Sequence, residues 1–214
     1  MKSQSLSDTS IISRYKEDDY HVVFIDKEGS SFYDGILKGV KVDSFHYNNV
    51  LQEIKDSSNI SIKRFSLHIK REWISLNVYK DKFYVYVPSE PYVNLHLAFT
   101  DSTVIINFFS DGYIPFIMQG ITDKKDGSIE FNIKGLYYEY SQIIVHFLSR
   151  QKDIAIVEFP LKQGEGRYHL VGAKEKIRSF PIIVNYCPGR RCDEWQFDKP
   201  DYKVLLSKGK VDGL

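Results

Sequence analysis

An alternation of apolar and polar residues, rich in aromatic side chains and broken by tight-turn residues, runs from residue 20 to about residue 162. It is clearest where Phe65, Leu67 and Ile69 alternate with polar neighbours. Successive side chains of a β-strand point to opposite faces, so a period of two indicates a strand with one buried face. The pattern predicts strands through most of the chain and argues against the alternating strands and helices of a nucleotide-binding α/β fold.

Composition supports the same prediction. Alanine, the best helix former, occurs only three times among 214 residues, whereas the chain has 15 Tyr and 14 Phe. Aromatic and β-branched residues favour strands. The composition is therefore that of a β-rich protein with few helices.

Turn-forming residues separate the predicted strands, as in the Asp-Gly pair at residues 126–127. Strands joined by short links usually pair with their neighbours in antiparallel fashion, which gives a meander. We expect strands at residues 20–25, 32–42, 60–69, 73–79, 83–87, 93–99, 104–109, 113–121, 129–133, 154–161, 167–171 and 182–186.

Three segments indicate helical structure. Tyr47, Val50, Leu51 and Ile54 form one apolar stripe at helical spacing. Residues 136–150 fit either a helix or a strand, and their length without Gly or Pro favours a helix. A single helical turn is expected at residues 174–178.

The predicted fold is α+β. It is a predominantly antiparallel β meander, forming a curved sheet or a partly closed barrel, with about two packed helices. We expect one domain at residues 17–206, a flexible arm at residues 1–16 and a frayed tail at residues 207–214.

Charge and hydropathy narrow the expected partners and location. The net charge of +1 gives no field that would draw in nucleic acid or anionic lipid. Residues 1–16 lack the apolar stretch of about 7–15 residues that a secretory signal has. No segment has the roughly 18 apolar residues of a membrane span. We expect a cytoplasmic protein without a membrane partner, and we leave its oligomeric state open.

The sequence Cys187-Pro-Gly-Arg-Arg-Cys192 is the most unusual local cluster. Pro-Gly favours a type II turn, which would expose Arg190 and Arg191 as a site for an anion or an acidic partner. Alternatively, Cys187 and Cys192 could be half of a zinc site or a redox pair, although the usual Cys-x2-Cys spacing is missing. An ordinary surface turn is the simplest interpretation.

A second candidate surface combines basic and aromatic residues. Lys70 and Arg71 precede Trp73, a combination that can bind a protein partner or single-stranded nucleic acid. The nearly balanced charge favours a protein partner. These three residues and the two arginines are the predicted binding residues.

No complete catalytic, nucleotide-binding or metal-binding motif occurs in the sequence. We therefore predict a non-enzymatic binding protein, without a cofactor, that acts through a protein partner in an accessory or immunity-like role. The alternative is a hydrolase-like enzyme with residues scattered across strands. Such an enzyme would need a histidine, His96 or His169, beside a carboxylate in a concave pocket.

Overall fold

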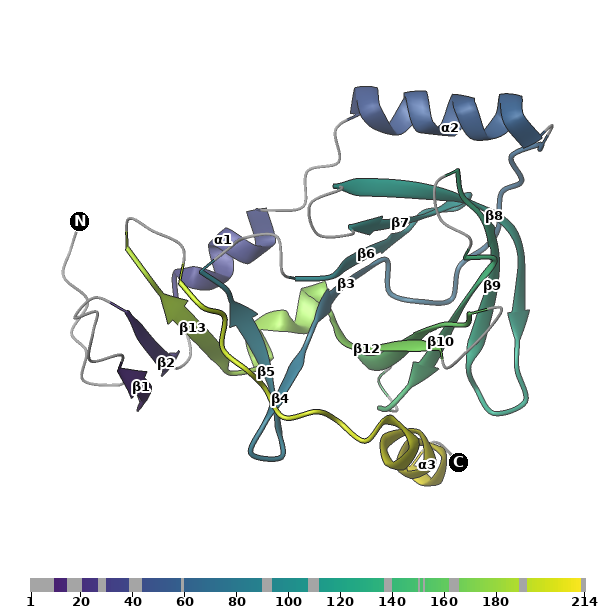
Figure 1. The fold of residues 1–214 in the computed structure, drawn as a ribbon. Coiled ribbons are helices and arrows are strands. Elements are labelled where there is room, and N and C mark those ends of the chain that lie inside the picture. The colour runs from purple at the N-terminus through teal and green to yellow at the C-terminus, as the bar shows by residue number, and fades with distance from the viewer. Residues whose placement is uncertain are drawn as a thin grey trace.

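The structure is a computed structural model that describes residues 10–14, 21–26, 30–38, 44–58, 60–89, 94–107, 112–136, 140–149, 151, 153–161, 166–188 and 192–212. Its elements in chain order (Figure 1) are β1 (Ser10–Arg14), β2 (Val22–Asp26), α1 (Phe32–Lys38), α2 (Ser44–Ser58), β3 (Glu72–Ser75), β4 (Asn77–Tyr79), β5 (Lys82–Val87), β6 (His96–Phe99), β7 (Thr103–Asn107), β8 (Tyr113–Asp123), β9 (Ile129–Lys134), β10 (Gln142–Phe147), β11 (Ile154–Phe159), β12 (Arg167–Ala173), the 3₁₀ helix η3 (Lys174–Ser179), β13 (Ile182–Tyr186) and α3 (Tyr202–Asp212).

Eight antiparallel strands close into a barrel in the order β10-β11-β12-β3-β6-β7-β8-β9. Strands β6 to β12 follow one another along the chain as a meander. Strand β3 closes the barrel by pairing with both β12 and β6. The predicted α+β fold with an antiparallel meander is therefore confirmed, and the sheet closes completely.

The interior of this barrel is filled by apolar side chains. An eight-stranded barrel is just wide enough for its inward-facing side chains to fill it. Here those side chains include five aromatic residues that are at most 2% exposed: Trp73, Phe99, Phe116, Phe131 and Phe159. The barrel interior is consequently a packed core.

A second sheet has the strand order β1-β2-β13-β5-β4 and lies beside the barrel (Figure 1). It is mixed, because β13 pairs with β5 in parallel and with β2 in antiparallel fashion. The chain passes from the barrel into this sheet at Leu76, between β3 and β4. A second apolar core, which includes Ile74, Leu76, Leu170, Ile177 and Ile182, joins the two bodies.

The predicted helix around residues 47–54 is confirmed as α2. Its buried Val50 and Ile54 cluster with Ile117 of β8, on the outer side of the barrel. The stripe at helical spacing thus marked the buried face correctly.

The strand predicted at residues 32–42 is wrong, because Phe32–Lys38 form helix α1. Tyr33 is fully buried in the second core, and the apolar residues one turn later pack beside it. At the N-terminal end, the backbone amide of Phe32 donates to the hydroxyl of Ser30 at 3.1 Å. Packing on the second core outweighs the weak helix propensity of Gly35. Residues 39–42 lie outside the described part of the chain.

The helix favoured for residues 136–150 is also wrong, because Gln142–Phe147 form strand β10. Ile143 and Val145 point into the barrel core, and β10 pairs with β9 on one side and β11 on the other. The two flanking strands provide partners for the backbone N–H and C=O groups of β10, so the segment is stable in the extended conformation. Residues 137–139 and 150 lie outside the described part.

Residues 60–69 form no regular strand, although their alternation is real: Phe65, Leu67 and Ile69 pack against the barrel core. Strand β1 lies within the segment expected to be an arm, and α3 extends into the segment expected to be a tail. In the described residues, no helix is both long and apolar enough to cross a membrane.

Candidate functional site

A charged pocket of about 430 Å³ lies between α1, the start of β3 and η3. Its volume is within the range of roughly 300–1,000 Å³ that is usual for ligand sites. Strand pairing builds it, because Ala173 lies opposite Trp73 and therefore brings Lys174 next to Glu72. The residues that line the pocket are Leu37, Arg71, Glu72, Lys174, Glu175 and Arg178.

Most of the charges around this pocket are paired. Lys174 Nζ lies 2.5 Å from Glu72 Oε2, and Lys70 Nζ lies 2.6 Å from Glu175 Oε1. The hydrogen bond from Lys70 lowers the pKa of Glu175. Exposed pairs of this kind contribute only about 0–1 kcal/mol each to stability. Because these ion pairs are weak, a charged ligand could replace one partner of a pair at a small cost in free energy.

Arg178 links the pocket to α1. Its guanidinium group pairs with Asp34 and lies over the ring of Tyr33, 5.6 Å from the centroid. The Tyr33 hydroxyl donates to the backbone carbonyl of Phe180 at the end of η3. One wall of the pocket is thereby fixed to the other.

Arg71 differs from the other charged residues of the pocket. No carboxylate pairs with it among the described residues, and its side chain is exposed. It was predicted as a binding residue together with Lys70; the structure places Arg71 in the pocket lining and Lys70 outside it, paired with the lining residue Glu175. Trp73 was predicted with them but lies inside the barrel, where its indole N–H donates to the carbonyl of Lys70 at 2.8 Å. Trp73 thus anchors the backbone beside the pocket and offers no surface to a partner.

Cys187 and Cys192 are joined by a disulfide bond. A sulfur atom in a disulfide is not available as the thiolate that zinc requires. Within the described residues, no group of three His, Cys, Asp or Glu side chains could hold a metal ion. Arg190 and Arg191, which were predicted to bind an anion, lie outside the described residues. Disulfides are rare in the reducing cytosol, so this bond gives no support to the predicted cytoplasmic location, which stays a prediction.

A partly buried polar network holds the segment that follows the disulfide. The carboxylate of Glu194 accepts hydrogen bonds from Tyr86 (2.5 Å), from the Ser89 hydroxyl (2.7 Å) and from the Asn185 amide (3.2 Å). Burial, together with the bond to Glu194, raises the pKa of Tyr86. Every member of this network has a partner, which indicates that it anchors the C-terminal segment to the second sheet.

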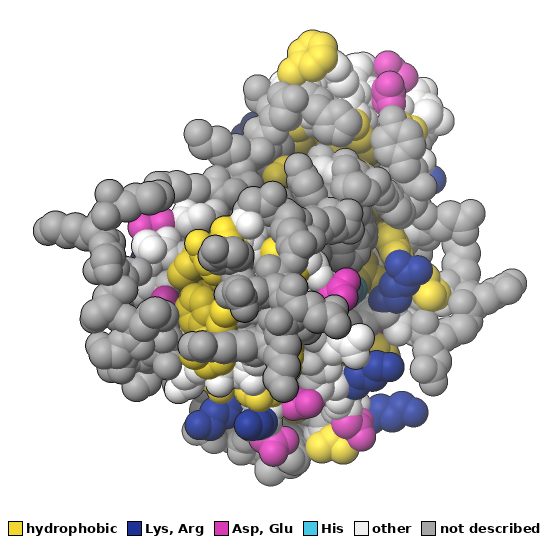
Figure 2. Space-filling model, turned by 60° about the vertical axis from the view of Figure 1, so that its left-hand side comes forward, with side chains coloured by type: hydrophobic (Ala, Val, Ile, Leu, Met, Phe, Trp, Pro, Cys, Tyr) yellow, Lys and Arg dark blue, Asp and Glu magenta, His cyan; other side chains and the backbone are white. Residues whose placement is uncertain are grey.

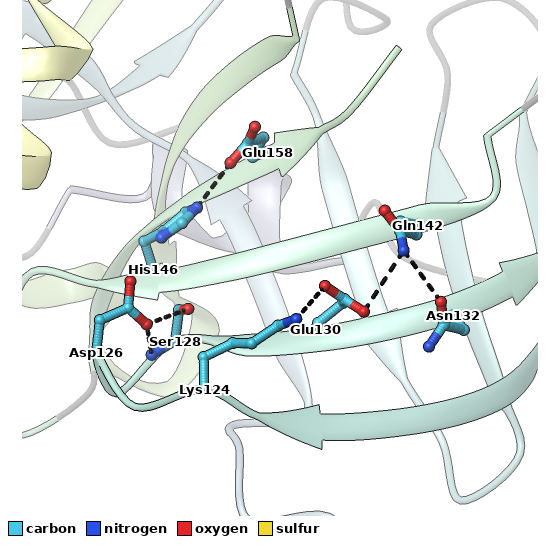
Figure 3. Close-up of polar contacts among 8 residues, drawn as sticks. All are labelled: Lys124, Asp126, Ser128, Glu130, Asn132, Gln142, His146 and Glu158. Atoms are coloured by element: carbon cyan, nitrogen blue, oxygen red, sulfur yellow. Dashed lines mark hydrogen bonds and ion pairs between the residues drawn. The ribbon is translucent and has the colours of Figure 1, made fainter. Parts of the chain in front are cut away.

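The structure brings one histidine and a carboxylate together, on the outer face of the barrel (Figure 3). Nε2 of His146 lies 2.8 Å from Oε2 of Glu158, and the Tyr168 hydroxyl donates to Oε1 at 3.2 Å. Nearby, Glu130 pairs with Lys124 at 2.7 Å and accepts from Gln142 at 3.5 Å. These residues form a polar outer face rather than the lining of the charged pocket.

The hydrolase-like alternative named His96 or His169, and neither has a carboxylate partner among the described residues. His169 lies edge-on to the ring of Phe159, and burial lowers its pKa. No described hydroxyl or thiol group bonds to His146, so the one histidine–carboxylate pair lacks a neighbouring nucleophile. Knowledge of the strand register would have revealed this pair. His146 of β10 lies opposite Ile156 of β11, and Glu158 is two residues further along the same face.

Four charged residues of the pocket were missed from the sequence, Glu72, Lys174, Glu175 and Arg178, as was the apolar Leu37. The four charged residues come from two segments about 100 residues apart, and the pairing of β3 with β12 brings them together. Charges elsewhere are mixed: Figure 2 shows Lys and Arg side chains interspersed with Asp and Glu over one face of the molecule.

In comparisons with known proteins, no family model matches this chain, and no curated protein or solved structure matches it.

Proposed function

We propose that this protein is a non-enzymatic binding protein whose charged pocket receives a carboxylate of an acidic segment on a protein partner. Arg71 carries the proposal, because it is the pocket's one cation without a carboxylate among the described residues. Its planar guanidinium group can hold a carboxylate through two parallel hydrogen bonds.

The remaining charges support a compact acidic group over a nucleic acid. Glu72 and Glu175 pair with lysines, so among the described residues Arg71 is the pocket's one unpaired cation. One unpaired cation suits a single carboxylate better than a continuous run of phosphates. A single carboxylate can enter beside Arg71, whereas Lys174 and Arg178 of the same lining already pair with carboxylates. Among the described residues visible in Figure 2, basic and acidic side chains are interspersed.

A charge-reversal experiment tests this function. We expect a fluorescein-labelled Glu-rich peptide to bind the protein in fluorescence polarisation, and a matched Gln-rich peptide to bind much more weakly. Arg71→Glu should weaken binding by about 10- to 100-fold, because a hydrogen bond to a charged group contributes about 1.5–3 kcal/mol.

Arg64→Glu is the matched control. Arg64 is also exposed, but it pairs with Asp101 at 3.4 Å and is not part of the pocket. Its reversal should change affinity by less than about threefold, as expected for a surface charge. Equal losses in the two variants would show that only the general surface charge matters, and failure of the Glu-rich peptide to bind would also contradict the proposal.

The natural partner can then be sought with the same pair of variants as baits. A partner of the pocket should be captured by the wild-type protein and by Arg64→Glu, but not by Arg71→Glu. The accessory or immunity-like role stays a prediction until such a partner is identified.

A further inference from the structure

Three polar residues form a row across neighbouring strands on the outside of the barrel. His96 of β6 lies directly opposite Asn107 of β7, which lies directly opposite Tyr113 of β8. The alternate residues Leu97 and Ile106 belong to the barrel core, so the polar side chains point away from it.

Two atoms of this row are buried and have no hydrogen-bond partner among the described residues: Nε2 of His96 and Oδ1 of Asn107. The His96 side chain is deeply buried, since the residue is only 7% exposed. Each such buried atom costs about 1–3 kcal/mol when it has no partner. Two of them on directly opposed residues indicate a group that the row is built to bind.

The surroundings determine the charge of that group. Burial and the nearby Lys174 lower the pKa of His96 to about 4, and Glu72 acts in the opposite direction. Burial also raises the pKa of Tyr113 to about 12. At neutral pH the row is therefore uncharged, and the two charges that act on His96, Lys174 and Glu72, form an ion pair with each other.

The donors and acceptors of His96 and Asn107 determine which chemical group the row can bind. Asn107 Oδ1 can only accept, so the bound group must donate to it. The Tyr113 hydroxyl lies 3.5 Å from Nδ1 of His96. When this hydroxyl donates to Nδ1, Nε2 of the neutral ring carries the hydrogen, and the bound group must accept from it.

We infer that His96 and Asn107 form a binding site for an uncharged primary amide or hydroxyl group, which donates to Asn107 Oδ1 and accepts from His96 Nε2. An anion lacks the donor that Asn107 needs, and a cation lacks the acceptor that His96 needs. This site differs from the one proposed for Arg71 in its residues and in the charge of its ligand.

Three molecules of the same shape test the inference: acetamide, acetate and acetamidinium, which are neutral, negative and positive. Ring nitrogens of ¹⁵N-labelled histidine would be followed by NMR at neutral pH during each titration. We expect acetamide to give a saturable shift of the His96 signals, and the two ions to give none. The exposed His68 serves as the internal control.

Asn107→Leu should abolish the saturable shift by removing the acceptor. Asn107→Ala is the second variant, in case leucine disturbs the fold, and it should have the same effect. The inference is overturned if acetamide shifts His96 no more than His68, if acetate acts as well as acetamide, or if the shift persists in a folded Asn107 variant. A crystal structure that shows only an ordered water between the two atoms in the presence of acetamide would likewise overturn it.

Discussion

Burial controls the protonation of His96, and this has a measurable effect on stability. The unfolded chain takes up a proton on this ring near pH 6.5, whereas burial and Lys174 lower the pKa in the folded protein to about 4. A lowered pKa means that the folded state binds the proton less well than the unfolded state. The contribution of His96 is therefore fully present above about pH 6.5 and is lost as the pH falls toward 4.

We predict that His96→Gln will reduce the acid sensitivity of the protein. Between pH 7.5 and pH 4.5 the wild-type free energy of unfolding should fall by about 2–3 kcal/mol more than that of the variant. Urea unfolding at the two pH values measures this difference. His68→Gln, at an exposed position, should behave as the wild type does; equal acid sensitivity in all three proteins would contradict the prediction.

Among the predicted binding residues, the sequence distinguishes poorly between surface and core. Lys70, Arg71 and Trp73 stand almost side by side in the sequence, yet Arg71 lines the charged pocket, Lys70 pairs with a glutamate of that lining, and Trp73 fills the barrel. Alternation with period two separates Lys70 from Trp73 but not Arg71, which has the same parity as Trp73. Arg71 is exposed because it precedes β3, whereas Trp73 lies within β3 and shares the barrel interior with Leu97 and Val171. This placement follows from strand pairing, which a single sequence does not contain.

At the scale of elements, β10 shows how two periodicities can coexist in one segment. Tyr140, Ile144 and Phe147 suit a helix, whereas Ile143 and Val145 suit a strand. The helix interpretation required Ile144 to be buried, and the structure instead buries Ile143 completely and leaves Ile144 partly exposed. Barrel closure, a property of eight strands together, decides between them.

Two neighbouring alanine substitutions test this assignment. Ile143→Ala should lower the free energy of unfolding by about 2–5 kcal/mol, because it leaves a cavity in the packed barrel. Ile144→Ala removes the same atoms from a partly exposed position and should cost clearly less. Chemical denaturation of both variants measures the difference, and the reverse order would favour a helix.

Helix α1 offers a second test through Gly35. A side chain at this position meets nothing within 4 Å. Gly35→Ala should therefore stabilise the protein by about 0.5–1 kcal/mol, since alanine favours a helix more than glycine does. Gly35→Val should stabilise less, because β-branched residues fit helices poorly. A strand would give valine the advantage, so the order of the two melting temperatures identifies the element.

At the scale of the whole molecule, Gly172 lies where the barrel meets the second core. A Cβ atom there would lie 3.0 Å from Leu76 Cδ1 and 3.2 Å from Phe180 Cε2. Both neighbours are packed against other residues of that core. The close approach explains why the position suits glycine within an otherwise regular strand.

Gly172→Ala should consequently destabilise the protein by about 1–3 kcal/mol through overpacking. Gly120→Ala is the matched control in a strand of the same barrel, where the nearest neighbour, Asn132 Nδ2, lies at an ordinary 3.6 Å. Thermal unfolding of both variants provides the comparison. A Gly172→Ala protein as stable as the Gly120→Ala protein would show that the junction yields easily.

The meander could be predicted from the sequence because its contacts join neighbouring strands with visible turns. The second sheet could not, because it joins β2 to β13 and pairs β13 with β5 in parallel. These partners are far apart in the chain, and nothing in their own residues specifies the match. The same limit hid the charged pocket, whose walls come from distant segments.

The position of β13 also imposes an order on biosynthesis. As the chain leaves the ribosome, β2 emerges with residues 22–26, but its partner β13 emerges only with residues 182–186. Strand β3 likewise waits for β12 before the barrel can close. For most of its synthesis the nascent chain therefore carries unpaired strand edges, which are prone to aggregation, and folding dominated by such distant pairings is slow. A chaperone that shields the N-terminal strands until the last fifth of the chain is made would raise the yield of folded protein.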